Sequence, residues 1–223
     1  MTIAIVALAA ALIGAAGPWV LRRMPEPPEP DEDKVTYADL SRTRGLAVGL
    51  AIGAALMAGI VAWKIEPPEL LPVWVLVTGV GSWLVFIDWR TRLLPYVVVA
   101  PTYLATYALV GLGAILLQDV DVLVDALVAN IVVYVIFRVL YAIARGAFGF
   151  GDVRLSAVLA TALGALGTHE VLVGMYAGFL LGAVFGLVLS RLKIVDSKSY
   201  AFGPYMVVGA VIGAAWGPAL YGS

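Results

Sequence analysis

The stretch TIAIVALAAALIGAAGPWVL, residues 2–21, contains no charged side chain, and Arg22 and Arg23 follow it directly. About 20 apolar residues in a helix are enough to cross the hydrocarbon core of a bilayer. A secretory signal peptide would carry its positive charge before the apolar run and a small-residue cleavage site after it. We therefore expect residues 1–21 to form an uncleaved first transmembrane helix with its N-terminus outside the cell.

The same apolar character continues along the chain. Of the 223 residues, 62% are hydrophobic and 13% are charged, whereas a soluble domain carries about 25% charged residues. The sequence therefore predicts an all-α polytopic membrane protein with about eight transmembrane helices, partnered by the lipid bilayer. The net charge of −1 gives no indication of a nucleic-acid partner. After the first span, the expected helices cover residues 45–63, 71–87, 93–117, 122–144, 153–167, 171–190 and 203–221.

A polar segment separates the first span from the others. The run PEPPEPDEDK, residues 25–34, alternates proline with acidic residues, and such a composition favours an extended, solvated linker over a helix. We expect a short cytosolic loop over residues 22–44 and a seven-helix membrane domain over residues 45–223.

The basic residues predict which way the helices run. Lysine and arginine are retained on the cytoplasmic side of a membrane. With the N-terminus outside, 13 of the 14 basic residues fall on the inner side if Arg138 extends to that surface, and only Lys64 lies outside. The sequence thus predicts a plasma (inner) membrane protein with both termini outside. Its inner segments are residues 22–44, 88–92, 145–154 and 191–202.

Small and aromatic residues add expectations about packing. Glycine repeats every four residues in three of the predicted spans, and this spacing lets helix backbones approach closely. Packing within the chain is the favoured interpretation and a dimer seam the weaker one, so the oligomeric state stays open. Tryptophans near span ends are expected to anchor the helices at the membrane surface. The glycines are Gly45, Gly49 and Gly53, then Gly174, Gly178, Gly182 and Gly186, and Gly209, Gly213 and Gly217; the tryptophans are Trp19, Trp63 and Trp74.

The absence of some residue types limits the kinds of catalytic and metal sites that the chain can form. The chain has no cysteine and a single histidine, His169. This excludes disulfides, cysteine-based zinc sites, a cysteine nucleophile and most serine–histidine triads. We expect neither a metal nor a cofactor, so any catalysis has to rest on carboxylates, lysine, arginine, tyrosine or the backbone.

Two aspartates stand out among the acids. Asp88 ends one apolar run and Asp152 begins another, 64 residues later. The predicted topology places both at the same depth, just inside the cytosolic boundary. Ionisable groups at that depth are costly unless they face a cavity or a partner.

Paired carboxylates can perform acid–base chemistry. When two of them share a low-dielectric site, they cannot both ionise easily and they hold one proton between them. The ionised one can take a proton from water while the protonated one polarises a peptide carbonyl, which is aspartyl proteolysis. A proton-coupled transporter could use the same two acids. A structural bundle is the third interpretation, in which Arg90, Arg92 and Arg154 neutralise them.

Three segments resemble the prepilin peptidase family, also called type IV leader peptidases, which are membrane aspartyl proteases of the GxGD type. GFGDVRL at residues 149–155 is similar to the family's GxGD signature, and DWRTRLLP at residues 88–95 to its other catalytic segment. FGPY at residues 202–205 is similar to the element that opens the last helix. The resemblance covers roughly residues 45–221 and implies a GxGD aspartyl protease-like helical bundle.

The resemblance also implies roles and partners. Asp88 and Asp152 would be the catalytic pair. The substrates would be prepilins or pseudopilins of type IV pili and protein secretion, whose short basic leaders are cut at the cytosolic membrane face. Many members carry two CxxC pairs that bind zinc after the first span, and this sequence is similar to the short form that lacks them, so methylation of the new N-terminus is undecided. The residues expected to contact the substrate or shape the site are Gly149, Gly151, Arg154, Pro95, Gly203 and Pro204.

Overall fold

The computed structural model describes residues 1–26, 35–143, 149–191 and 201–221. Within these ranges all regular secondary structure is helical, as the composition predicted. The helices are α1 (Thr2–Ala15), α2 (Gly17–Leu21), α3 (Tyr37–Leu40), α4 (Leu46–Lys64), η1 (Pro68–Leu70), α5 (Leu71–Thr91), α6 (Tyr96–Leu117), α7 (Asp121–Ile143), α8 (Phe150–Gly164), α9 (Thr168–Arg191) and α10 (Gly203–Tyr221).

Each of the eight predicted apolar segments forms a helix. In the described part of the chain, six of them are long and apolar enough to cross a membrane: Thr2–Leu21, Leu46–Lys64, Pro68–Thr91, Tyr96–Leu117, Asp121–Ile143 and Thr168–Phe185. The multi-pass, all-α prediction is therefore confirmed. Helix α8 has 15 residues, which is shorter than a bilayer-spanning helix.

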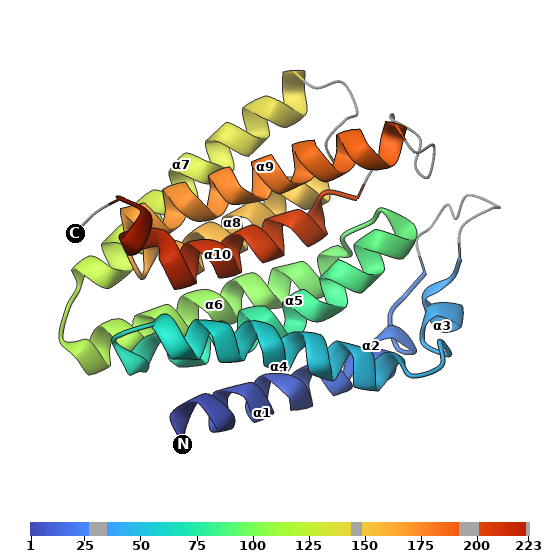
Figure 1. The fold of residues 1–223 in the computed structure, drawn as a ribbon, viewed down its shortest axis with the longest axis horizontal. Coiled ribbons are helices and arrows are strands. Elements are labelled where there is room, and N and C mark those ends of the chain that lie inside the picture. Colours follow the sequence, from blue (N-terminus) through green and yellow to red (C-terminus); the bar gives the residue numbers. More distant parts are fainter. Residues whose placement is uncertain (27–34, 144–148, 192–200, 222–223) are drawn as a thin grey trace.

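Helix α8 lies in the interior of the bundle. Nearly all of its side chains from Asp152 to Gly164 are buried. Figure 1 shows α1 and α4 on one side of the molecule and α7 on the other, with α5, α6, α8 and α10 between them. Helices α9 and α10 pack closely along their length, as do α1 with α4 and α7 with α8. This arrangement surrounds α8 with protein and leaves α1, α4 and α7 facing outward.

One end of the bundle collects the segments that hold most of the basic residues. Figure 1 shows the end of α2, helix α3, the α5–α6 connection and the starts of α8 and α10 at this end, and both chain termini at the other. We call it the basic end. Its described basic residues include Arg22, Arg23, Arg42, Arg44, Arg90, Arg92 and Arg154.

Several helix boundaries differ in detail from the predicted spans. The first span breaks at Ala16, before Gly17 and Pro18, because proline removes a backbone donor and disturbs the preceding turn. Helix α5 continues to Thr91 and ends where Arg92 adopts a left-handed conformation with φ 57°. Helix α6 begins at Tyr96 with Pro95 as its N-cap, three residues later than the start predicted for that span.

The glycine prediction holds for one pair of helices and is wrong for another. A Cβ on Gly209 or Gly213 would collide with the backbone of α9, so these residues allow α9 and α10 to approach closely. A Cβ on Gly45, Gly49 or Gly53 would meet nothing within 4 Å. The glycine-lined face of α4 therefore points away from the bundle, and α4 packs through Leu50, Ala54, Ala58 and Val61 instead.

The tryptophan prediction also fails at one position. Trp19 and Trp63 are exposed near helix ends, and each ring lies under a basic side chain, that of Arg23 or Lys64. Trp74 is fully buried, with a relative exposure of 0%, because α5 is a central helix covered by its neighbours. It is a core residue and not a surface anchor.

Candidate active site

Asp88 lies in the last turn of α5 and is almost completely buried, with 3% of its surface exposed. Its Oδ2 accepts a hydrogen bond of 2.8 Å from the backbone N–H of Gly203, the first residue of α10. A Cβ on Gly203 would lie 2.7 Å from the same oxygen, so only glycine allows this approach. The C-terminal end of a helix carries partial negative charge, which is unfavourable for a carboxylate, whereas an N-terminal end is favourable. The N-terminal end of α10 therefore provides the backbone donor and the partial positive charge that the C-terminal end of α5 does not offer to Asp88.

Asp152 lies in the first turn of α8 and is also buried, at 7% exposed. Its Oδ2 accepts a hydrogen bond of 2.9 Å from the backbone N–H of Gly149, the N-cap residue. An acidic side chain at the third helical position commonly bonds back to the N-cap amide in this way. Local helix chemistry therefore accounts for the position of Asp152, in contrast to that of Asp88.

The fold brings the two aspartates close enough to interact electrostatically. Helices α5, α8 and α10 all pack against one another. The turn that carries Asp152 also contacts the chain just after α5, because a Cβ on Gly151 would lie 2.7 Å from the Cβ of Leu94. Two residues separated by 64 positions in sequence thus meet at the basic end of the bundle.

The arginines that could have neutralised these acids do not do so among the described residues. Within those ranges, neither Asp88 nor Asp152 forms an ion pair with an arginine. The Arg154 guanidinium instead lies 4.5 Å from the ring centre of Tyr96 and 4.6 Å from that of Phe150. The salt-bridge interpretation of the two aspartates is therefore not supported by the structure.

Two prolines of the quoted segments and a buried asparagine of α7 have structural roles near the starts or between the sides of the helices. Pro95 caps α6, and Pro204 is the second residue of α10, where a missing N–H costs no helical bond. The buried Asn130 of α7 donates to the Ala157 carbonyl and to Thr161 of α8, and accepts from Tyr103 of α6. Asn130 joins three helices and does not contact the aspartates.

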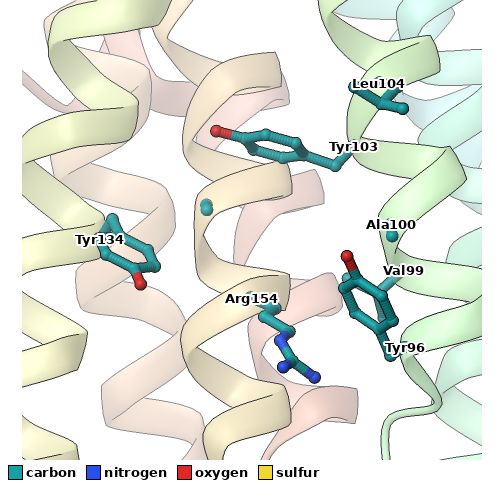
Figure 2. A pocket seen from close by; sticks show the side chains of 8 residues that line it. Tyr96, Val99, Ala100, Tyr103, Leu104, Tyr134 and Arg154 are labelled. Atoms are coloured by element: carbon teal, nitrogen blue, oxygen red, sulfur yellow. The ribbon is translucent and has the colours of Figure 1, made fainter.

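The described residues contain no group of three or more histidine, cysteine or acidic side chains that could hold a metal ion. The structure also contains a cavity of about 320 Å³ between α6, α7 and α8, and neither aspartate lines it. Figure 2 shows its lining side chains, which include Arg154 and three tyrosines. Sequence reasoning did not predict this cavity, because it depends on how α6 and α7 are spaced.

The sequence model of the type IV leader peptidase family matches residues 75–190, just over half of the chain. The chain belongs to the type IV leader peptidase family. The matched region contains both Asp88 and Asp152 and ends before Gly203.

Curated members of the leader peptidase family are similar over most of this chain. A prepilin leader peptidase/N-methyltransferase of Pseudomonas putida is 30% identical over 178 residues, which is 75% of this chain and 58% of that protein. One from Aeromonas salmonicida (strain A449) is 32% identical over 177 residues, 74% of this chain and 56% of that protein. The chain thus spans less than three fifths of the length of these relatives. No solved structure gives a significant match.

Proposed function

We propose that this chain is an aspartyl endopeptidase that removes leader peptides from type IV prepilins or pseudopilins, with Asp88 and Asp152 as the catalytic pair. One observation carries the proposal: two buried aspartates from helices distant in sequence interact with each other, in a member of the leader peptidase family. Each accepts a hydrogen bond from a backbone N–H, and within the described ranges neither is paired with an opposite charge. This arrangement suits a pair of carboxyl groups that exchange protons during catalysis.

The hydrogen bonds indicate which oxygens are used. In both residues Oδ2 accepts the backbone N–H, which leaves Oδ1 for a shared proton or for water. The ionised carboxylate would take a proton from a water molecule as that water attacks the scissile carbonyl. The protonated partner would polarise the carbonyl and then protonate the leaving amine. Backbone donors fix the orientation of both acids without neutralising either, so the proton stays available to the substrate.

The location of the pair at the basic end supports cleavage at the cytosolic face of the plasma membrane. Basic residues are retained on the cytoplasmic side, and both chain termini lie at the opposite end of the bundle (Figure 1). A C-terminal alkaline phosphatase fusion should therefore be active, and a C-terminal fluorescent protein that folds only in the cytosol should stay dark. The opposite pattern would place the site on the outer face and contradict the proposal.

Co-expression with a prepilin in cells that lack their own leader peptidase tests the catalytic assignment. Asp88→Asn and Asp152→Asn should each leave the prepilin at full length while the enzyme accumulates in the membrane. Asp125→Asn is the matched control, because it changes an exposed carboxylate on α7 in the same way and should leave cleavage intact. Cleavage by either active-site variant would refute the assignment. The mass of the mature N-terminus would decide whether the product is also methylated.

A further inference from the structure

The cavity between α6, α7 and α8 opens to the side of the bundle and is separate from the aspartates. Its volume is about 320 Å³, at the lower end of the range of small-molecule sites, so it can enclose only part of a lipid. Tyr96 and Leu104, on its α6 wall, are both mostly exposed. The adjoining surface of α7 is a continuous run of exposed aliphatic side chains, including Leu127, Ile131 and Val135. The cavity is thus a lateral groove whose open side faces hydrocarbon.

The groove has a polar end and an apolar end. Figure 2 shows Arg154 extending from α8 between Tyr134 of α7 and Tyr96 of α6, with Tyr103 and Leu104 further along. Arg154 is the fifth residue of α8, near the start of that helix, so the polar end lies at the basic end of the bundle. Beyond it, the walls are formed mainly by aliphatic and aromatic side chains. The groove therefore matches a lipid in the order of its polar and apolar parts, since a site for a charged head group lies next to a site for an acyl chain.

A second arginine lies near the same aromatic ring, although it is not one of the residues that line the cavity. The guanidinium of Arg138, on α7, is 5.9 Å from the ring centre of Phe150, and that of Arg154 is 4.6 Å from the same ring. In the described part of the chain, neither of them forms an ion pair with a carboxylate. The sequence that joins the two helices, residues 144–148, contains a further arginine and no acid. Two cations therefore border one ring, and no carboxylate from the described part of the chain pairs with either of them.

We propose that this groove binds an anionic phospholipid, with the phosphate between Arg138 and Arg154 and an acyl chain along the apolar wall. Basic pockets between membrane helices on the cytoplasmic side are suited to anionic head groups, and the inner leaflet is rich in such lipids. A substrate segment is a less suitable occupant, because a substrate has to reach the aspartates and neither of them lines the groove. The proposal does not depend on the protease assignment.

Native mass spectrometry of the purified full chain tests the head-group site, with palmitoyl-oleoyl phosphatidylglycerol as the probe and the phosphatidylcholine of the same chains as reference. An arginine near an anionic lipid contributes about fivefold in affinity. Arg138→Gln with Arg154→Gln should therefore lower phosphatidylglycerol affinity about 25-fold and leave phosphatidylcholine unchanged. The single change Arg138→Gln should lower it about fivefold, which provides a second measurement if the double variant does not fold.

Two further variants separate this site from general charge effects. Arg44→Gln with Arg90→Gln removes the same charge from exposed positions at the same end of the bundle, and should retain phosphatidylglycerol within twofold of the unmodified chain. Ala100→Trp fills the groove from α6 without changing charge, and should reduce occupancy by both lipids.

Three results would overturn the proposal. The first is equal phosphatidylglycerol affinity in the unmodified chain and the Arg138/Arg154 variant. The second is an equal loss in the Arg44/Arg90 control. The third is unchanged lipid affinity in the groove variants together with weaker binding of a prepilin, which would assign the groove to the substrate. All of these measurements are of binding, so they stay informative if the chain does not cleave prepilins.

Discussion

Replacing Gly203 by alanine tests how the proposed active site is held together. The added Cβ would lie 2.7 Å from Oδ2 of Asp88, 3.3 Å from its Cγ and 3.5 Å from its Cβ. Ordinary van der Waals contact begins at about 3.4 Å, so the oxygen has to move by about 0.7 Å. That movement lengthens the 2.8 Å hydrogen bond from the Gly203 N–H and turns the carboxylate away from its present orientation.

The expected effect is on the rate of cleavage. A displacement of about 1 Å in a catalytic group can cost about 100-fold in rate, so we expect kcat/KM for a purified prepilin to fall about 10- to 100-fold in Gly203→Ala. Single-turnover cleavage in detergent would measure this, with gel filtration to confirm that the variant is folded. The fall should appear in the chemical step and not only in KM, because in the proposed mechanism Asp88 acts on the scissile bond and not on distant parts of the substrate.

Gly53→Ala is the matched control for this substitution. A Cβ at Gly53 would meet nothing within 4 Å, and alanine is the better helix former by about 1 kcal/mol, so this variant should be at least as stable and cleave within twofold of the unmodified chain. A folded Gly203→Ala protein that cleaves at the unmodified rate would refute the view that α10 positions Asp88. An equal loss in Gly53→Ala would show that the assay reports general damage.

Three other changes test different parts of the structure. Gly209→Ala should destabilise the protein by about 1–3 kcal/mol, measured by thermal unfolding, because its Cβ collides with the backbone of α9. Asp152→Asn should lower the unfolding temperature by about 2 °C, because it removes a favourable charge at the start of α8. Asp88→Asn should raise the unfolding temperature, because it removes a buried charge from the end of α5. A lower unfolding temperature in Asp88→Asn would show that Asp88 has a structural role. Burial, and then the Glu26 carboxylate, raises the pKa of Tyr37 above its ordinary value of 10.0, so the stabilisation linked to the neutral phenol is present below pH 10 and is lost as the pH rises through the raised pKa. In an ultraviolet titration Glu26→Gln should lower the Tyr37 midpoint only in part, and a complete return to the ordinary value would show that burial is not the larger cause.

The positions of the helices could be predicted from the sequence because a bilayer imposes a length and a composition on every span. The meeting of Asp88 and Asp152 could also be predicted, since the basic residues set the direction of each helix and so the depth of each acid. What the sequence did not reveal is the bond from Gly203 to Asp88, which joins residues 115 positions apart. Only the resemblance of the FGPY segment pointed to that region.

The failures have one physical cause. In a soluble protein, a polar face marks the side of a helix that contacts water. In a bilayer, lipid and protein interior are both apolar, so the pattern does not show which face is buried. The glycines of α4 and of α10 have the same spacing, yet one set faces outward and the other packs against α9. Trp74 was placed at the membrane surface for the same reason, since an apolar helix end shows nothing of its neighbours.

The two aspartates differ in how far local helix structure explains their positions, and this difference bears on the proposed catalytic function. Asp152 is compatible with a purely structural role, because an acid in the first turn of a helix bonds the N-cap amide and favours the helix. Asp88 has no such local structural advantage, because it lies buried in the last turn of α5, where a carboxylate is disfavoured. The one hydrogen bond that its side chain accepts from the described part of the chain requires a glycine at the start of another helix. Asp88 lowers the stability of the fold and needs a glycine at position 203 to be accommodated, and such residues are expected where activity is retained at the expense of stability. Asp88 is therefore stronger evidence for the proposed catalysis than Asp152.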